Sequence, residues 1–475
     1  MINYRSQTKI IATIGPASAS IEVLEKMIHE GIDVCRLNFS HGSYEDHLKV
    51  IENVQILNKK LKTNIALLAD LQGPKIRIGD VENNGVEINQ GDEILFVNEE
   101  CTGTKEKVYL SYKSFASDVS VGDFILIDDG KLKLEVIHTN NKDIVKAKVI
   151  YGGILSSKKG VNLPSTKISM PSLTEKDIAD VNFALEHNVN WVALSFVRSV
   201  TDIVDIKEII KKYRKHTRVI AKIEKPEALK EIDNIIDLTD GIMVARGDLG
   251  VEVPFDQVPI IQKMLVKKCI QASKPVIIAT QMMESMITNF RPTRAEANDV
   301  ANAVIDGADA LMLSGETSVG KYPVGVINSM QSIIKHTEDN GYNFYREHQS
   351  IDFTQTFMPD SICSAACKLA EQSNASAIVA FTYSGYTPIK ISSYRPKAHV
   401  FAFTGNNEQL CKMSLIWGLR AYSFDKFTDI DEAIKYTINF LKEGGLIKDG
   451  DVIVHVGSTP LFERGQTNML KLSYV

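Results

Sequence analysis

The sequence KIIATIG at residues 9–15 is short, apolar and rich in β-branched residues, so it predicts a buried β-strand. Residues 21–29 follow with apolar residues at helical spacing. The alternation continues with a strand at 34–39, an amphipathic helix at 44–61 and a third apolar strand, IALLADL, at 65–71. Continuous apolar strands separated by helices are typical of a parallel sheet that is covered on both faces.

The alternation stops between Gly73 and about Ser169. This stretch has no long helical pattern and contains many short strands rich in Val, Ile and Lys. Turn signals break these strands at Gly91-Asp92, Gly122-Asp123 and Asp129-Gly130. We therefore predict a small β-barrel or sandwich domain, residues 74–169, inserted into the first domain.

Strand–helix alternation resumes at Met170. Five further strands are predicted at Trp191–Phe196, Val219–Glu224, Ile242–Arg246, Val276–Thr280 and Ala310–Leu313. With the first three they make eight strands, and residues 1–73 and 170–342 together approach the roughly 250 residues of a (β/α)8 TIM barrel. An open doubly wound sheet is the alternative.

A separate α/β domain is predicted at residues 343–475. Its expected strands are Ala377–Tyr383, His399–Phe403, Leu419–Phe424, Val452–Val456 and Met469–Ser473. Its expected helices are Ser361–Gln372, Glu408–Leu415 and Ile430–Glu443. The predicted fold class is thus α/β: a TIM barrel with an inserted β-barrel domain and a C-terminal α/β domain.

Composition limits the possible classes of function. The 475-residue chain has 54 Lys and Arg against 59 Asp and Glu, a net charge of -5. No excess positive charge is available for a nucleic-acid backbone, so we expect no nucleic-acid partner. Apolar runs such as 375–380 are far shorter than the about 20 residues of a membrane helix, and the first residues lack the apolar core of a signal peptide. The six cysteines form no CxxC pair, and we expect a soluble cytoplasmic protein.

Charged residues occur where barrel strands end, the usual place of the active site in this fold. Lys222 and Glu224 alternate with apolar residues, so both point to the same side, into the barrel mouth. Glu224 and Asp248, from adjacent strands, offer oxygen ligands to one divalent ion, and so sparse a set suits Mg²⁺, which keeps water and substrate ligands. The alternative is a Lys222–Glu224 ion pair that only closes a layer of the barrel.

Three cations, Arg36, Arg77 and Lys222, are expected at the same rim. Together with the metal carboxylates they imply a multiply anionic substrate and favour phosphoryl transfer, which needs cations around the transferred group. Residues 247–250, GDLG, can present backbone N–H groups to a carboxylate or phosphate. No GxxxxGK[ST] or GxGxxG motif occurs, so any nucleotide must be bound in another way.

Ser40 and His41 follow the second strand. We predict that they cap the helix that begins near Tyr44, because Ser is favoured at helix starts. A catalytic role for His41 is the alternative.

Motifs along the whole chain, in order, resemble those of the pyruvate kinase family. They are TKIIATIGPAS (8–18), CRLNFSHG (35–42), GPKIR (73–77), KGVNLP (159–164), AKIEKPEAL (221–229), DGIMVARGDLG (240–250), ATQMMESM (279–286), RPTRAEANDVANAV (291–304) and LSGET (313–317). The resemblance implies the family's plan of a (β/α)8 domain A, an inserted β-barrel domain B and an α/β domain C. It also implies transfer of the phosphoryl group of phosphoenolpyruvate to ADP, giving pyruvate and ATP.

The resemblance implies roles for the metal and phosphoryl site. Glu224 and Asp248 would bind Mg²⁺, for which Mn²⁺ could substitute, and would hold the substrate through it. Lys222 would stabilise the phosphoryl group during transfer. Arg36 would contact both the substrate phosphate and the nucleotide. The residues implied on the nucleotide side are Asn38, His41 and Arg77.

The resemblance also implies how the rest of phosphoenolpyruvate is held. Backbone N–H groups at Gly247 and Asp248, with the Thr280 hydroxyl, would bind its carboxylate. Thr280 and Ser314, with water, would supply the proton that converts enolpyruvate to pyruvate. Closure of the inserted domain would exclude water from the site. Family members are usually homotetramers, which we expect here on resemblance alone.

The loop TYSGYT at residues 382–387 follows a strand of the C-terminal domain. The hydroxyls of Thr382, Ser384 and Thr387 surround Gly385 at a helix start, an arrangement that suits a phosphate. In the family this loop holds the phosphate of an allosteric effector. A phosphorylated sugar or nucleoside monophosphate is therefore expected, although an ordinary capped turn is the alternative.

One region departs from the family pattern. Many pyruvate kinases bind K⁺ through residues that match Asn38, Ser40 and Asp70 and through a threonine, with a glutamate nearby. Here the threonine position is Leu71, which has no hydroxyl, and the glutamate position is Lys75. Two cations at one rim would repel, so the Lys75 ammonium is expected to replace K⁺, as in the K⁺-independent branch of the family. The alternative is that Lys75 points to solvent and K⁺ still binds.

Two other classes of function remain open from the sequence. A carbon–carbon lyase of the phosphoenolpyruvate/pyruvate barrel type would share the metal carboxylates, but it would not need the large insertion or three converging cations. A non-catalytic effector-binding protein should have lost Lys222 or a metal ligand, and it has lost neither.

Overall fold

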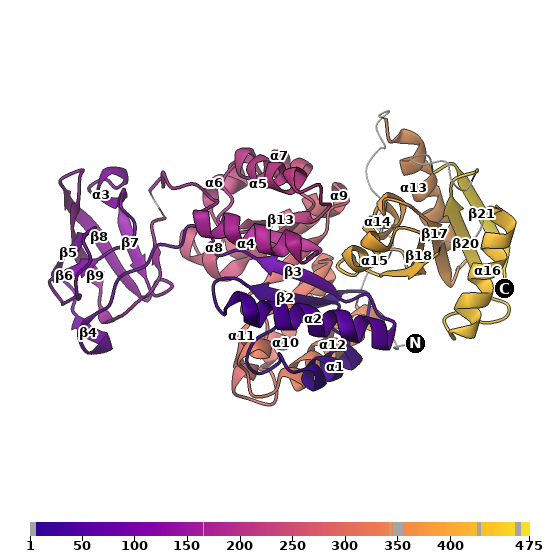
Figure 1. The fold of residues 1–475 in the computed structure, drawn as a ribbon, viewed down its shortest axis with the longest axis horizontal. Helices are drawn as coiled ribbons and strands as arrows, with labels where there is room; N and C mark the ends of the chain where they lie inside the picture. Colours follow the sequence, from indigo (N-terminus) through magenta and orange to yellow (C-terminus); the bar gives the residue numbers. More distant parts are fainter. Residues whose placement is uncertain (1–5, 165, 342–343, 345–354, 425–428, 461–466) are drawn as a thin grey trace.

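The computed structural model describes residues 6–164, 166–341, 344, 355–424, 429–460 and 467–475. The predicted boundary between residues 342 and 343 lies outside these residues. Three lobes follow one another along the longest axis, with the barrel in the middle, the insertion at one end and the C-terminal domain at the other (Figure 1). Of the helices described, none is both long and apolar enough to cross a membrane.

The central lobe is a closed barrel of eight parallel strands. In chain order they are β1 (Lys9–Thr13), β2 (Val34–Asn38), β3 (Ala66–Asp70), β12 (Trp191–Leu194), β13 (Arg218–Ile223), β14 (Gly241–Ala245), β15 (Val276–Ala279) and β16 (Ala310–Leu313). Closure between β1 and β16 confirms the predicted (β/α)8 fold, and the open-sheet alternative is wrong.

Helices follow the strands and cover the barrel. The longer ones are α1 (Ile21–Glu30), α2 (Tyr44–Leu61), α4 (Glu175–Glu186), α5 (Val200–Lys212), α7 (Ile232–Leu238), α9 (Val258–Gln271), α10 (Arg294–Asp306) and α12 (Pro323–Asn340). Short helical turns at the strand ends are α6 (Pro226–Lys230), α8 (Arg246–Glu252), η2 (Glu284–Ile287) and α11 (Gly315–Ser318).

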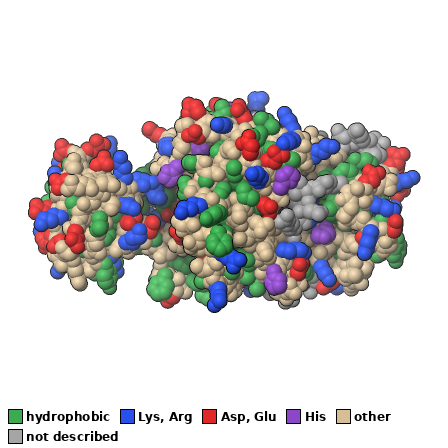
Figure 2. Space-filling model, turned by 90° about the horizontal axis from the view of Figure 1, so that it is seen from below, with side chains coloured by type: hydrophobic (Ala, Val, Ile, Leu, Met, Phe, Trp, Pro, Cys, Tyr) green, Lys and Arg blue, Asp and Glu red, His purple; other side chains and the backbone are tan. Residues whose placement is uncertain are grey.

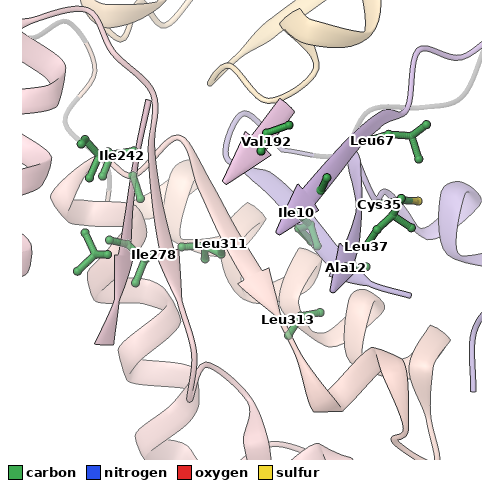
Figure 3. Close-up of a cluster of buried hydrophobic side chains, with 14 of the residues drawn as sticks. Ile10, Ala12, Cys35, Leu37, Leu67, Val192, Ile242, Ile278, Leu311 and Leu313 are labelled. Atoms are coloured by element: carbon green, nitrogen blue, oxygen red, sulfur yellow. The ribbon is translucent and has the colours of Figure 1, made fainter. Parts of the chain in front are cut away.

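Period-two alternation along the strands divides the core. Ile10 and Ala12 of β1 belong to the apolar cluster between strands and helices, where they lie with Leu37 of the neighbouring β2 and Leu67 of β3 (Figure 3). Ile11, between them, belongs to the cluster inside the barrel. Each strand is therefore buried on both faces, which explains the continuous apolar runs of the sequence.

The start of α2 differs from the prediction. Ser43, rather than Ser40 or His41, is the N-cap: its hydroxyl accepts the Asp46 N–H, and the Asp46 carboxylate accepts the Ser43 N–H at 3.0 Å. This capping box satisfies two backbone donors at once, which a lone serine hydroxyl cannot do. Ser40 and His41 lie in the turn before the helix.

The insertion between β3 and α4 has its own core. Its six-stranded sheet has the order β11-β7-β8-β9-β5-β6, and β4 pairs separately with β10. The elements are η1 (Glu82–Asn84), β4 (Gly85–Ile88), β5 (Glu93–Val97), β6 (Lys107–Tyr109), α3 (Phe115–Asp118), β7 (Phe124–Ile127), β8 (Leu132–Thr139), β9 (Ile144–Tyr151), β10 (Gly153–Ser156) and β11 (Val161–Asn162). Gly91 and Gly122, in two of the predicted turns, have φ of +94° and +96°, which glycine adopts without strain.

The C-terminal lobe is a five-stranded sheet of order β19-β18-β17-β20-β21, in which only β21 is antiparallel. Its strands are β17 (Ala377–Phe381), β18 (His399–Thr404), β19 (Leu419–Ser423), β20 (Val452–Gly457) and β21 (Met469–Tyr474). Its helices are α13 (Phe357–Gln372), α14 (Tyr386–Ser393), α15 (Asn407–Met413) and α16 (Ile430–Glu443).

A buried ion pair joins this lobe to the amino ends of the barrel strands. Arg395 donates from Nη2 to Asp309 Oδ2 at 2.8 Å, and both side chains are nearly inaccessible (2% and 4% exposed). Asp309 precedes β16 and also accepts the backbone N–H of Trp417 from the C-terminal lobe at 3.1 Å. The C-terminal lobe thus packs on the end of the barrel opposite to the strand ends that carry the predicted site.

We expect Arg395→Met to destabilise the protein strongly, because it leaves Asp309 as a buried carboxylate without its cation. Breaking a buried pair by removing one partner costs about 3–5 kcal/mol. The exposed Lys335–Asp339 pair (52% and 52% exposed) provides a control, since such helix pairs contribute about 0.3–0.5 kcal/mol. Thermal unfolding should show a large drop in midpoint for Arg395→Met and almost none for Lys335→Met. Equal drops would contradict the role of the buried pair.

Candidate functional site

Lys222 occupies the centre of the barrel mouth. It is the fifth residue of β13, and its ammonium lies 2.9 Å from Glu224 Oε1 and 3.1 Å from Asp70 Oδ1. It also donates to the Ser195 hydroxyl at 2.7 Å. Burial alone would lower the pKa of this ammonium, but Asp70, Glu224 and Asp248 raise it above its usual value. Two strand-end carboxylates therefore stabilise the charged form of Lys222, and its contact with Glu224 confirms that the two side chains point to the same side.

Arg36 is joined to Lys222 through Asp70. Its Nε donates to Asp70 Oδ2 at 2.7 Å, and its Nη1 donates to the Thr13 hydroxyl at 2.8 Å. Burial acts to raise the pKa of Asp70, but Lys222 and Arg36 hold it below its usual value. Asp70 belongs to the region predicted for a monovalent cation. In the structure its Oδ2 accepts from Arg36, and its Oδ1 lies 3.1 Å from the Lys222 ammonium. The sequence motifs did not indicate this bridge.

Glu224 and Asp248 form the candidate metal centre. Glu224 Oε2 accepts the Phe196 N–H at 2.7 Å, and the side chain is 1% exposed. The pKa of Glu224 is raised, first because burial removes it from water and also because Asp248 adds a like charge. A cation bound by both carboxylates would relieve the repulsion between their negative charges, and oxygen donors of this kind suit a hard divalent ion. The described residues contain no group of three or more His, Cys, Asp or Glu that could hold a metal, so water and substrate would complete the ligand set.

Gly247 and Thr280 are brought together from neighbouring strands. The Gly247 N–H, in the first turn of α8, donates to Thr280 Oγ1 at 2.8 Å. A Cβ at position 247 would lie 3.3 Å from the same oxygen, so glycine permits this approach. The Thr280 hydroxyl itself donates to the Ala279 carbonyl at 2.6 Å. An N–H and a hydroxyl therefore lie side by side at the rim, a pair of donors that suits a carboxylate.

Ser314 lies at the start of α11 and is linked indirectly to the Thr280 loop. Its N–H donates to Glu316 Oε2 at 2.7 Å, while Glu316 Oε1 accepts the Met283 N–H at 3.2 Å. Burial raises the pKa of Glu316. Among the described contacts, none joins the Ser314 and Thr280 side chains directly.

The residues predicted on the nucleotide side are Asn38, His41 and Arg77. Burial lowers the pKa of His41, and the charges of Arg77, Lys75 and Arg36 act in the same direction. Asn38 Oδ1 accepts the Ser40 N–H at 3.1 Å.

Arg77 lies within the insertion, where its Nη1 donates to the Lys158 carbonyl of the same domain at 3.0 Å. In the space-filling view, Lys and Arg side chains lie beside the hollow between the insertion and the barrel (Figure 2).

Leu71 and Lys75 are the two positions at which the sequence differs from the K⁺-binding pattern of the family. Leu71 is buried, whereas Lys75 is exposed and lines the cleft between barrel and insertion together with Asp248. Among the described residues, no hydrogen bond or ion pair joins Lys75 to Asn38, Ser40 or Asp70.

A second buried pair connects the site to the insertion. Lys225 Nζ lies 2.7 Å from Glu252 Oε1, and that oxygen also accepts from Asn162 Nδ2 of β11 at 2.8 Å. Both charged side chains are almost fully buried (7% and 1% exposed). The sequence motifs did not indicate this link, because Asn162 and Glu252 are 90 residues apart and neither stands at a predicted strand end.

The candidate effector loop lies in the C-terminal lobe, at the start of α14. Thr382 Oγ1 accepts the Gly385 N–H at 2.9 Å, and Ser384 Oγ accepts the Tyr386 N–H at 3.3 Å. Thr387 Oγ1 lies 2.6 Å from the Thr467 hydroxyl. Gly385 has a φ of +85°, a conformation that favours glycine. The Thr382 and Ser384 hydroxyls thus lie with the Gly385 and Tyr386 N–H groups at one turn, whereas Thr387 is buried and bonded to Thr467.

Comparison with known proteins decides the family. Residues 5–327 match the family model of the pyruvate kinase barrel domain, and residues 360–473 match that of the pyruvate kinase alpha/beta domain. The chain belongs to the pyruvate kinase family. Pyruvate kinases are phosphotransferases, and the resemblance predicted from the motifs is confirmed.

Individual pyruvate kinases match over nearly the whole chain. The enzyme of Geobacillus stearothermophilus is 42% identical over 474 residues, which is 99% of this chain and 81% of the relative. That of Staphylococcus aureus is 40% identical over 472 residues, 99% of this chain and 80% of the relative. A solved pyruvate kinase structure from Cryptosporidium parvum superposes with a TM-score of 0.91 at 33% identity, covering 99% of this chain and 96% of that one.

Proposed function

We propose that this chain transfers the phosphoryl group of phosphoenolpyruvate to ADP at the barrel mouth, giving pyruvate and ATP, and that Mg²⁺ is its divalent ion. The observation that carries the proposal is the buried Lys222 ammonium, held in ion pairs with both Asp70 and Glu224. A fixed cation beside two metal carboxylates suits a transferring phosphoryl group, whose charge must be neutralised. Mn²⁺, also a hard ion, should substitute.

Glu224 and Asp248 are the residues that would hold Mg²⁺. When bound, the ion would neutralise charge on the substrate phosphate and carboxylate. Lys222 and Arg36 would bind the phosphoryl oxygens from the protein side. Asp70, hydrogen-bonded to Arg36 and ion-paired with Lys222, would keep the guanidinium and the ammonium at a constant separation.

The other half of the substrate would be held by donors of the neighbouring strands. The Gly247 N–H and the Thr280 hydroxyl would bind the carboxylate. The N–H now donates to Thr280 Oγ1 and the hydroxyl to the Ala279 carbonyl, so the substrate would replace both of these acceptors. The Thr280 hydroxyl, with Ser314 and water, would pass a proton to the methylene carbon of enolpyruvate. Glu316 supports this arrangement because it accepts N–H groups from both loops.

The insertion, residues 74–169, would act as a lid over the nucleotide. Asn38, His41 and Arg77 would contact ADP at the hinge of this lid, next to the barrel domain of residues 1–73 and 170–342. Closure would exclude water and so protect the phosphoryl group from hydrolysis. The C-terminal domain, residues 343–475, would regulate the enzyme.

We further propose a cytoplasmic homotetramer that acts without a membrane or nucleic-acid partner. The six cysteines are free thiols, as is usual in a reducing compartment. The homotetramer is proposed because members of the family are usually homotetramers. ADP-dependent formation of pyruvate, followed in a coupled assay, separates the proposed activity from a carbon–carbon lyase and from a non-catalytic effector-binding protein.

Lys222→Met tests the central cation. The side chain keeps its length but loses its charge, so we expect turnover to fall by at least about 10²–10³-fold while the fold is retained. Lys9→Met is the matched control: Lys9 is also a buried barrel-strand lysine, 3.5 Å from Asp33, but it lies at the opposite end of the barrel. It should lower stability and leave turnover nearly unchanged. Turnover near that of the unmodified enzyme in Lys222→Met would refute the assignment.

We propose that the enzyme does not require K⁺. Leu71 is buried and offers no hydroxyl, and Lys75 places an ammonium in the cleft that Asp248 lines. Because the Lys75 side chain is exposed and long, its ammonium could extend along the cleft toward the proposed substrate site.

Steady-state kinetics with Mg²⁺, in buffers whose only other cation is a bulky quaternary ammonium, test this proposal. We expect near-full activity for the unmodified enzyme and a new K⁺ requirement for Lys75→Glu. Lys113→Glu makes the same charge change at an exposed position of the insertion and should create no such requirement. Strong stimulation of the unmodified enzyme by K⁺ would show the proposal to be wrong.

We propose that residues 382–387 bind the phosphate of an allosteric activator, a phosphorylated sugar or a nucleoside monophosphate. The phosphate would accept the Gly385 and Tyr386 N–H groups that Thr382 and Ser384 now satisfy. The eight-residue helix α14 would add its N-terminal dipole.

The double variant Ser384→Ala/Thr387→Ala should lose activation by such phosphates while its basal turnover is kept. Activity is measured against a panel of sugar phosphates and nucleoside monophosphates, with Ser423→Ala, at the end of β19, as the control. An unchanged response of the double variant to every effector would mean that the site lies elsewhere.

A further inference from the structure

Thr280 has an unusual backbone conformation. Its φ is +69°, and that of the following Gln281 is +55°, so two successive non-glycine residues are left-handed directly after β15. A β-branched residue is rare in this region, which costs about 1–3 kcal/mol and persists only where the surroundings enforce it. Some contact must therefore hold the Thr280 loop in place.

Arg246 makes that contact. Its Nη2 donates to the Thr280 carbonyl at 2.8 Å and to the Gln281 carbonyl at 3.4 Å, across from the neighbouring strand. The same residue precedes Gly247, whose N–H donates to Thr280 Oγ1 at 2.8 Å. Thr280 is thus held at its carbonyl and at its hydroxyl by two consecutive residues of the first turn of α8.

Asp299 fixes the guanidinium in turn. Arg246 Nη1 donates to Asp299 Oδ1 at 2.8 Å, and Nη2 lies 2.7 Å from Asp299 Oδ2, so a hydrogen bond and a second ion contact join the two side chains. The arginine side chain is 11% exposed and the aspartate 35%. A planar fork can satisfy a carboxylate and a carbonyl together, whereas the single ammonium of a lysine cannot reproduce that geometry.

We propose that Arg246, anchored by Asp299, is a positioning residue that orients the Thr280 hydroxyl toward the substrate carboxylate and the enolpyruvate carbon. The inference rests on the proposed function, in which Thr280 contacts the substrate. Arg246 touches no reacting atom: it acts only through the backbone of the Thr280 loop. Because Asp299 belongs to α10, this bond also ties the reaction geometry to that helix.

A double-mutant cycle with Arg246→Lys and Thr280→Ala tests the proposal. We expect Arg246→Lys to lower kcat/KM for phosphoenolpyruvate by about 100-fold, the effect of a displacement of about 1 Å. In the Thr280→Ala background the same change should lower it by less than about threefold, because the hydroxyl that Arg246 orients is gone. The KM for ADP should stay within about twofold throughout. If Arg246→Lys lowered kcat/KM by the same factor with and without the Thr280 hydroxyl, the proposal would be overturned.

Two further variants keep the test decisive. Asp299→Asn preserves hydrogen bonding to Arg246 but removes the charge. It should therefore lower kcat/KM by about 10-fold, and only while the Thr280 hydroxyl is present. If Arg246→Lys does not fold, Asp299→Asn takes its place in the double-mutant cycle. Lys274→Met removes a 2.6 Å bond to the Thr239 carbonyl near the other end of β15 and should lower stability without changing kcat/KM.

The outcomes separate this inference from the proposed function. Unchanged kinetics in Thr280→Ala would refute the substrate role of Thr280 and therefore overturn this inference, while the proposed phosphoryl transfer would stand. A large loss in Thr280→Ala, combined with an equal effect of Arg246→Lys in either background, would leave the proposed function standing and overturn only the role of Arg246.

Discussion

The buried ammonium of Lys222 is the charge on which the barrel mouth depends. It lies within 3.1 Å of Asp70 and within 2.9 Å of Glu224, and all three side chains are almost removed from water. Neither carboxylate could stay ionised there without a cation, and the cation could not stay charged without them. Arg36 donates a second charged hydrogen bond to Asp70. The negative charge of Asp248 acts on Glu224, and a divalent cation would offset the repulsion between these two carboxylates. The charges of this cluster thus come from β2, β3 and β13 and from the turn after β14.

Barrel geometry converts short sequence motifs into this cluster. Closed parallel strands bring their carboxyl ends to one rim, so residues far apart in sequence meet there. At the opposite rim, Asp309 and Arg395 bind the barrel to the C-terminal domain. The insertion leaves the barrel after β3, at the end that carries the candidate site, and Asn162 links it back to Glu252. Polar contacts therefore attach the barrel to the insertion at one end and to the C-terminal domain at the other.

Much of this architecture could be predicted, because strand alternation has a period of two and places Lys222 and Glu224 on one side. The double pairing of Asp70 could not, since it depends on which strands become neighbours around the barrel. The reach of Arg246 to Thr280 depends on the conformation of a long side chain, which no sequence pattern specifies. For the cap of α2, by contrast, the signal was present: an acidic residue three positions after Ser43 indicates a capping box.

Glu224 and Asp248 are proposed to hold one divalent ion together with the substrate, and the mechanism depends on that pair. Titration of Mn²⁺ into the protein, followed by electron paramagnetic resonance of the free ion, tests the pair most directly, with and without phosphoenolpyruvate. About one tight site per chain should appear, its affinity should rise with phosphoenolpyruvate, and Glu224→Gln should weaken it at least about 10-fold. Unchanged Mn²⁺ affinity in Glu224→Gln, in the presence of phosphoenolpyruvate, would contradict this metal site.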